Sequence, residues 1–323
     1  MGHVADIDTP RAYPRLGCGA RFKQVPDDFR VTEVLRFAPG AVGEHLYLQI
    51  EKVATETLEI AQRLAEFYSV TLADIGFAGF KDTQAVATQW FSIRTPSDLA
   101  PAPSAQWRVV GRGRNAKKLR RGQHAGNQFC LRLREVVGTG WEERLAAVAV
   151  GGVPNYFGPQ RFTAGAVERA SAWLQRRQAC RAGSRGGVGW YLSVLRSHLF
   201  NQVVGRRVQA ANWHRLIDGD VPACAGARYR VPTGPLWGRG RSPAAGLARE
   251  VERDALAEHH ELCHGLEFTG LQQDRRALVL LPQNLRWRAA DSDLELSFAL
   301  PRGGYATSVL REIFVLKGSA GGV

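Results

Sequence analysis

The sequence has few cysteines, and none of them stand in a C-x-x-C pair. The five that are present form an odd number and are scattered along the chain: Cys18, Cys130, Cys180, Cys224 and Cys263. Secreted proteins that depend on a disulfide framework use an even set at regular spacings. The pattern argues against such a framework and fits a reducing compartment, so we expect a cytoplasmic protein.

Long apolar runs and several catalytic motifs are also missing. No run approaches the roughly 18 apolar residues needed to cross a bilayer, and residues 1–17 hold no apolar stretch of signal-peptide length. Asp6 breaks the N-myristoylation pattern. The sequence contains neither a P-loop lysine motif nor a nucleophile-elbow serine. We therefore expect no membrane partner and no chemistry of these two kinds.

Basic residues, by contrast, are abundant. The chain of 323 residues has 43 Lys and Arg against 30 Asp and Glu, which gives a net charge of +13 and a pI near 10.1. Such an excess favours a polyanionic partner, either nucleic acid or an acidic membrane surface. Arginine far outnumbers lysine, which can also reflect genome base composition, so the position of the charges is more informative than their total.

The order of the periodic segments predicts an α+β protein with a helical insertion. Residues 27–37 and 44–53 alternate as strands, residues 55–70 repeat as a helix that Thr55 or Thr57 could cap, and residues 107–137 are typical of strand, basic loop and strand. Helical patterns dominate from about 165 to 275, including one helix over 246–262. Strand patterns return over 277–289, 294–300 and 303–316. This order indicates one α+β domain interrupted by an inserted helical domain.

One segment concentrates the positive charge. Between Arg108 and Arg134 the chain has nine Lys and Arg and no acid, with Trp107, His124 and Phe129 interleaved. A solvated surface normally mixes both signs, whereas phosphate neutralisation needs a cationic cluster. A plain solvated loop is the alternative. We expect nucleic-acid contact here, through Lys117, Lys118, Arg120 and Arg121.

The sequence HELCH, from His260 to His264, fits the H-E-x-x-H zinc pattern. In that interpretation the two histidines bind zinc and Glu261 is the general base. However, Gly265 follows at once, where a zincin helix would continue, and no third ligand is obvious. The simpler interpretation is a histidine-rich helix end closed by a glycine C-cap.

Asp82 is an isolated acid in the apolar stretch GFAGFKDTQAVATQWFSI, residues 76–93. An ionised carboxylate in such a setting needs a cation or hydrogen bonds. A structural ion pair, a cap and a reactive group are therefore all open. Gly76 and Gly79 allow close backbone approach, and Lys81 or another cation could partner the acid.

Several stretches together resemble the tRNA pseudouridine synthase D (TruD) family of uridine-to-pseudouridine isomerases. GFAGFKDTQAVATQ is similar to the family block G-x-K-D-x-x-A-x-T-x-Q, and NAKKLRRGQHAGNQF is similar to the block K-L-R-x-G-x-x-x-G-N-x-F. Four more segments follow in the expected order: VPNYFGPQRF, RSHLFNQVV, GLQQDRRAL and GGYATSVLRE. The resemblance extends over nearly the whole chain.

The resemblance implies a role for six residues. Asp82 would be the nucleophile, and Lys23, in RFKQVPDDF, would orient it and keep it ionised. The target nucleotide would be contacted by Phe29, Asn127, Phe129 and Tyr305, of which Asn127 hydrogen-bonds the uracil, Phe129 stacks on it and Tyr305 lines the pocket from the C-terminal strand region. Attack of Asp82 on ribose C1′ and on base C6 both fit.

The resemblance further implies a pseudouridine-synthase-type catalytic domain with a mixed, mainly antiparallel sheet, formed by residues 1–152 and 280–323. Residues 153–279 would form the inserted, mainly helical TRUD domain. The partner would be tRNA, modified at the uridine of position 13, with no cofactor and no metal. We expect a monomer. The alternatives are a non-catalytic RNA-binding protein and a zinc hydrolase that uses HELCH.

Overall fold

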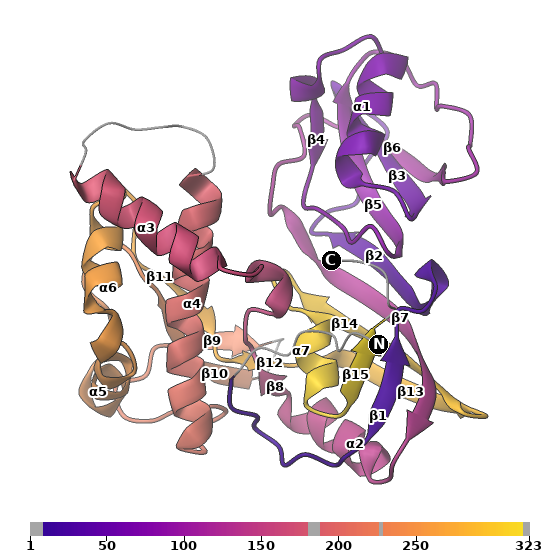
Figure 1. The fold of residues 1–323 in the computed structure, drawn as a ribbon. Helices are drawn as coiled ribbons and strands as arrows, with labels where there is room; N and C mark the ends of the chain where they lie inside the picture. The colour runs from indigo at the N-terminus through magenta and orange to yellow at the C-terminus, as the bar shows by residue number, and fades with distance from the viewer. Residues whose placement is uncertain (1–8, 180–187, 226–228, 319–323) are drawn as a thin grey trace.

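The computed structural model describes residues 9–179, 188–225 and 229–318 (Figure 1). It shows an α+β protein with a mixed, mainly antiparallel sheet and a mainly helical insertion, which confirms the predicted fold class. In Figure 1 the helices of the insertion stand to one side of the sheet. The first and last strands of the described residues pair with each other, so the two ends of the chain close one domain.

The main sheet has ten strands among the described residues. These are β1 (Gly19–Phe22), β2 (Phe29–Leu35), β3 (His45–Val53), β4 (Ile75–Phe77), β5 (Val86–Arg94), β6 (Trp107–Asn115), β7 (His124–Val137), β13 (Gln283–Ala290), β14 (Asp293–Pro301) and β15 (Val315–Gly318). Seven of them follow the order β13-β14-β7-β2-β5-β3-β6. The pairs β2–β5 and β1–β15 are parallel, and the other pairs are antiparallel.

Two apolar clusters hold helices against this sheet. The helices α2 (Trp141–Gly151) and α7 (Ala306–Arg311) share one cluster with β7 and β14, whose inward side chains alternate along the strand. The helix α1 (Thr57–Phe67) shares the other cluster with β3 and β5. Each fully buried Leu, Ile or Phe contributes about 1.5–3 kcal/mol, so these clusters fix the frame that carries the loops.

The insertion has its own core. It contains α3 (Ala166–Ala179), α4 (Val188–Gln209), α5 (Gly246–Ala255) and α6 (His260–Glu267), together with the three-stranded sheet of β9 (Pro222–Ala225), β10 (Tyr229–Leu236) and β11 (Asp274–Ala277). The described chain also has four single-turn helices, of which η3 (Pro159–Arg161) and η4 (Ala257–His259) lie in the insertion and η1 (Pro26–Asp28) and η2 (Leu72–Asp74) lie before it. The main apolar cluster of the insertion joins α3, α4 and α6.

A short ladder marks the junction between the two parts. The strands β8 (Val153–Pro154) and β12 (Val279–Leu280) pair antiparallel, with Val153 opposite Leu280. The chain therefore leaves the main sheet and returns to it at adjacent points. We propose on this basis that the domains are divided at 152/153 and 279/280.

The prediction of a strand pattern over residues 303–316 is wrong in part. Residues 306–311 form α7, and only Val315–Gly318 is a strand. Ala306, Val309 and Leu310 are buried at helical spacing, i, i+3 and i+4, which places them on one face toward the core. A six-residue helix gives too short a repeat to be distinguished from alternation in the sequence.

Three predicted helix ends also differ. The N-cap of α1 is Glu56, with no side-chain cap, because the Thr55 and Thr57 hydroxyls bond elsewhere. The helix predicted over 246–262 is broken at Leu256, whose side chain is buried in the core of the insertion. The helix α6 continues through Gly265 to Glu267, which buries Leu266, so Gly265 is not its C-cap.

The four cysteines that fall in the described residues, Cys18, Cys130, Cys224 and Cys263, carry free thiols. Cys180 lies outside the described residues. None of the described helices is both long enough and apolar enough to cross a bilayer.

Candidate functional site

Asp82 lies in the loop between β4 and β5 and is held at both carboxylate oxygens. Its Oδ2 forms an ion pair with Lys23 Nζ. Its Oδ1 accepts a hydrogen bond from the backbone N–H of Gln84, with an N···O distance of 3.0 Å. The Asp82 side chain is still 43% exposed. A carboxylate that is oriented in this way and open to solvent can meet a bound substrate.

Lys23 directly follows β1 and has a left-handed backbone, with φ of 55°. A non-glycine residue in this region stores about 1 kcal/mol or more of strain, and such residues cluster at functional sites. The Lys23 ammonium lies 4.0 Å from the centroid of the Phe29 ring. The same ammonium therefore contacts both the Asp82 carboxylate and an aromatic face.

Phe29 and Phe129 form an aromatic pair beside this ammonium. Phe29 begins β2, Phe129 lies on the neighbouring β7, and their ring centroids are 5.8 Å apart in an edge-to-face arrangement. The two residues are only 8% and 6% exposed. Because most of each ring is packed in the core, the pair can form the floor of a pocket but not an open stacking platform.

Asn127 is oriented by a buried ion pair. Lys81 Nζ donates to Asn127 Oδ1 at 2.7 Å and lies 2.8 Å from Glu33 Oε2. The Lys81 and Glu33 side chains are 6% and 0% exposed. Although Lys81 precedes Asp82 in the sequence, it is directed at Glu33 and Asn127, and Lys23 is the cation that reaches the carboxylate.

Tyr305 is separate from this group. It is the N-cap of α7, its hydroxyl accepts a hydrogen bond from Arg161 Nη2 at 3.3 Å, and its ring centroid is 6.3 Å from that of Phe157. In the part of the chain that the structure describes, its ring and polar contacts are with this segment and not with Asp82 or Lys23. It follows the turn after β14, whose Leu300 pairs with Asn127, so it stands at the same end of the sheet.

Two residues of the site were not predicted. The Thr57 hydroxyl accepts the backbone N–H of Lys81 at 3.1 Å, which ties the start of α1 to the loop of Asp82. Lys52 is fully buried, and its Nζ donates to the backbone oxygen of Thr55 at 2.5 Å and to that of Asp82 at 3.4 Å. The sequence held a signal for Lys52, since it continues the inward alternation of Leu46, Leu48 and Ile50.

The buried Lys52 predicts a pH-dependent stability. Burial lowers the pKa of Lys52 from its ordinary value of 10.5 to about 8, although the negative charge of Asp82 acts to raise it. The folded chain thus binds fewer protons than the unfolded chain between pH 8 and 10.5, so this group makes stability rise with pH there. One pKa unit corresponds to about 1.4 kcal/mol, so the buried charge costs about 3 kcal/mol below pH 8.

Lys52→Met is therefore expected to raise the free energy of unfolding at pH 7. The gain should be about 2 kcal/mol, because the lost hydrogen bond to Thr55 removes about 1 kcal/mol. Urea unfolding of both proteins at pH 7 and pH 10 measures it. The difference should shrink at the higher pH, and a difference independent of pH would show that Lys52 carries no such cost.

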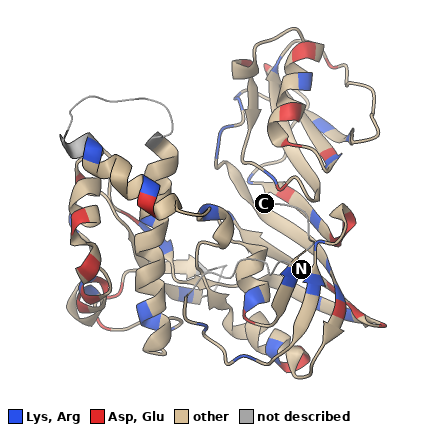
Figure 2. Cartoon of the chain, in the orientation of Figure 1, with Lys and Arg blue, Asp and Glu red and all other residues tan. Residues whose placement is uncertain are grey.

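The structure divides eight of the nine basic residues into two sets, and the ninth, Arg112, donates to the backbone oxygen of Asp98. Four arginines of the strands pair with carboxylates from other parts of the chain: Arg108 with Glu51, Arg114 with Asp98, Arg132 with Asp293 and Arg134 with Asp28. The predicted RNA-binding residues lie in the loop between β6 and β7, and none of them forms an ion pair with another described residue. Figure 2 shows acidic residues on α1, α5 and α6, outside this loop. Because its four basic residues have no ion-pair partner in the described chain, the loop keeps its positive charge available for RNA.

The basic loop, residues 116–123, packs against the segment that leads to Asp82. The Arg121 guanidinium carbon lies 4.0 Å from the ring centroids of both Phe77 and Phe80, and Lys118 Nζ donates to the backbone oxygen of Ala73. A Cβ on Gly76 would lie 2.3 Å from Leu119 O, so glycine is needed for this close approach. Lys117 and Arg120 are exposed. The loop therefore borders the Asp82 site.

The HELCH residues do not form a metal cluster in the described chain. His260 and His264 lie exposed on α6, and the His264 ring packs against Phe268 with centroids 4.9 Å apart. Within the described ranges no three His, Cys, Asp or Glu side chains gather closely enough to hold a metal ion.

Comparisons with known proteins agree on one family. The family model described as tRNA pseudouridine synthase D (TruD) matches residues 11–171 and 223–313. A tRNA pseudouridine synthase D of Methylococcus capsulatus is 41% identical over 95% of this chain and 94% of its own length, and one of Cellvibrio japonicus is 42% identical over 96% and 94%. A solved TruD structure from Methanosarcina mazei superposes with a TM-score of 0.68 at 20% identity, over 94% of this chain and 95% of that one. This last likeness concerns the fold.

Proposed function

The chain belongs to the tRNA pseudouridine synthase D (TruD) family and converts a uridine of tRNA to pseudouridine, and we propose that Asp82 is the nucleophile of this reaction. The observation that carries the proposal is the contact between Asp82 and Lys23, which are 59 residues apart in the sequence. Two residues that the family resemblance pairs are brought together by the fold, and the carboxylate remains open to solvent.

The reaction breaks the N-glycosidic bond, turns the retained uracil and rejoins it to the ribose through C5, so no atom is gained or lost. Attack of Asp82 on ribose C1′ displaces the base, whereas attack on base C6 forms an adduct whose N-glycosidic bond then breaks. On either route the bond to Asp82 breaks again once C5 is joined to C1′, and C5 loses its proton while N1 gains one. Lys23 holds Oδ2 and the Gln84 N–H holds Oδ1, so the carboxylate is oriented before the substrate arrives. The Phe29 and Phe129 pair lies beside Lys23 and forms the floor on which the base rests.

Asn127 reads the base through its amide nitrogen. An ammonium can only donate, so the contact with Lys81 fixes Oδ1 as the acceptor and leaves Nδ2 to donate. Uracil offers two carbonyl oxygens to such a donor, whereas cytosine presents an amino group in place of O4. The buried Glu33–Lys81 pair therefore gives Asn127 a fixed polarity, which favours uracil where Nδ2 donates to O4, and Tyr305 lines the pocket from the end of β14.

The tRNA is held by the basic loop and by the side of the insertion next to the main sheet, which does not include α5 (Figure 1). Lys117, Lys118, Arg120 and Arg121 border the Asp82 site and supply phosphate contacts. The target is the uridine at position 13, as the family resemblance implies. A complete site within one chain supports action as a monomer, and free thiols support a cytoplasmic location.

Incubation of the pure protein with unmodified tRNA tests this function. Mapping of pseudouridine should find one modified site, at position 13, and a transcript with cytidine there should stay unmodified and compete poorly for binding. Binding without any modification would identify a non-catalytic RNA-binding protein instead. Modification at another position would refute the assignment of position 13 alone.

A further inference from the structure

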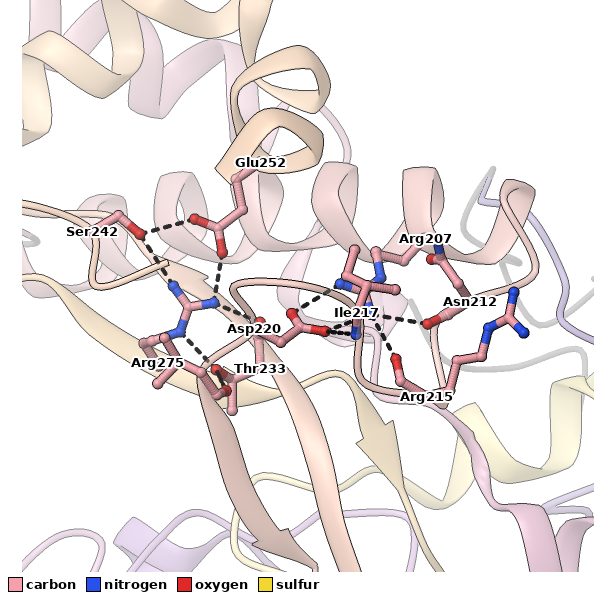
Figure 3. A network of polar contacts seen from close by, with 10 residues as sticks. Arg207, Asn212, Arg215, Ile217, Asp220, Thr233, Ser242, Glu252 and Arg275 are labelled. Carbon is pink, nitrogen blue, oxygen red and sulfur yellow. Dashed lines mark hydrogen bonds and ion pairs between the residues drawn. The ribbon is translucent and has the colours of Figure 1, made fainter. Parts of the chain in front are cut away.

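Two arginines of the insertion whose side chains are largely buried have a carboxylate partner. Figure 3 shows two such networks, in which Arg207 pairs with Asp220 at 3.0 Å and Arg275 pairs with Glu252 at 2.6 Å. The Arg207 side chain is 3% exposed and that of Arg275 is 10% exposed. In both cases an acid of the same domain neutralises the guanidinium, which offsets much of the cost of burial.

Arg276 follows Arg275 on β11 but has a different environment. Its Nη2 donates to Asn155 Oδ1 at 2.6 Å and to the backbone oxygen of Gly303 at 2.9 Å. Its guanidinium carbon lies 4.1 Å from the centroid of the Phe157 ring. Within the described residues it forms no ion pair, and its Nε is buried without an acceptor. Burial lowers the pKa of Arg276 to about 10, so its charge is poorly compensated.

A second arginine shares the same aromatic ring. The Arg161 guanidinium carbon lies 5.8 Å from the centroid of Phe157, and Arg161 Nη2 donates to the Tyr305 hydroxyl. Its Nε is likewise buried without an acceptor, and the described residues offer it no ion pair. Two guanidiniums thus lie near one phenylalanine ring, and neither has an ion-pair partner among the described residues. Two positive charges that are close together and partly buried destabilise the fold unless an anion binds between them.

The position of Arg161 and Arg276 in the fold indicates which anion they bind. Arg161, Arg276 and Tyr305 lie at the junction of the insertion with the main sheet, and Tyr305 follows the turn after β14, beside the strand of Asn127. A guanidinium fork and a phenolic hydroxyl are donors that suit a phosphate oxygen. We propose that Arg161, Arg276 and Tyr305 form a binding site for a backbone phosphate of the RNA near the target nucleotide. This inference rests on the proposed function.

The test compares tRNA binding of the wild type and Arg161→Gln as a function of salt. The Arg161 side chain forms one hydrogen bond within the described chain, to the Tyr305 hydroxyl, so its replacement should not prevent folding. The melting temperature of the variant checks this. We expect affinity to fall about tenfold and the slope of log K against log salt to decrease by about 0.7–0.9, the value for one phosphate. Arg276→Lys, which keeps the charge but loses the fork, should weaken binding with a smaller change in slope.

Arg253→Gln is the matched control, because Arg253 is exposed on α5 and pairs with Asp254. It should leave both affinity and slope unchanged. A folded Arg161→Gln protein with wild-type affinity and slope overturns the proposal. A second result would also overturn it. If Arg161→Gln binds tRNA as the wild type does but is no longer stabilised against heat by inorganic phosphate, the site binds free phosphate and not RNA. Since wild-type modification of tRNA is measured separately, failure here leaves the proposed function standing.

Discussion

Asp82→Asn abolishes pseudouridine formation and leaves tRNA binding largely unchanged: this is the expected result with the largest effect. The amide is nearly the same size as the carboxylate and can still accept the Gln84 N–H, so the loop should keep its shape. However, an amide is not a nucleophile at neutral pH, and it offers no opposite charge to Lys23. Removal of a catalytic nucleophile costs on the order of 10⁴-fold or more in rate. Pseudouridine mapping after single turnover measures it.

Asp254→Asn is a suitable control for this experiment. It also removes one carboxylate from an ion pair, with Arg253, but on the exposed surface of α5, so its activity should equal that of the wild type. A melting curve shows whether the Asp82→Asn protein is folded. If the folded variant still forms pseudouridine at a comparable rate, another group is the nucleophile.

Reversal of Lys117, Lys118, Arg120 and Arg121 to Glu should weaken tRNA binding strongly and flatten its salt dependence. Each phosphate contact contributes about 0.7–0.9 to the slope of log K against log salt, so four lost contacts would reduce it by about 3. The four residues have no ion-pair partner among the described residues, so their charges are free to meet the RNA. Filter binding from low to high salt measures both quantities.

The double reversal of Lys117 and Arg120 separates charge from packing. Arg121 lies on two phenylalanine rings and Lys118 bonds to Ala73, so Glu at either position also removes a structural contact. Lys117 and Arg120 are exposed, and their reversal should reduce the slope by about 1.5. The same change at Arg253 and Arg288, which are 72% and 75% exposed, is the control. Equal slopes in the two double variants would mean that the loop is a solvated surface.

Much of the fold could be predicted from the sequence because it depends on regular alternation. The alternation over residues 44–53 predicts a strand, and the structure has β3 as His45–Val53, since Leu46, Leu48 and Ile50 are apolar and point inward. The segment 303–316 could not be predicted, because a helix of six residues is stabilised by packing against the core and not by its own repeat. The break at Leu256 has a similar cause, as burial of one side chain overrides a continuous helical pattern.

The site could be predicted only where the family resemblance linked residues that are far apart in the sequence. Residue type and spacing alone suggested Lys81 as a partner of Asp82, because the two are neighbours. In the structure Lys81 bonds Glu33 and Asn127, whereas the partner is Lys23, which a sequence pattern cannot place beside residue 82. Arg276 illustrates the same limit: its neighbour Arg275 pairs with Glu252, whereas Arg276 has no ion-pair partner in the described part of the chain.

The paired strands β8 and β12 bear on how such a protein could arise. Adjacent strands lie about 4.8 Å apart, so the chain enters and leaves the insertion at neighbouring points, where Val153 pairs with Leu280. A segment joined at these two points can differ in length without opening the sheet from which the Asp82 loop extends. Shortening or exchanging that segment between relatives would leave the catalytic frame closed.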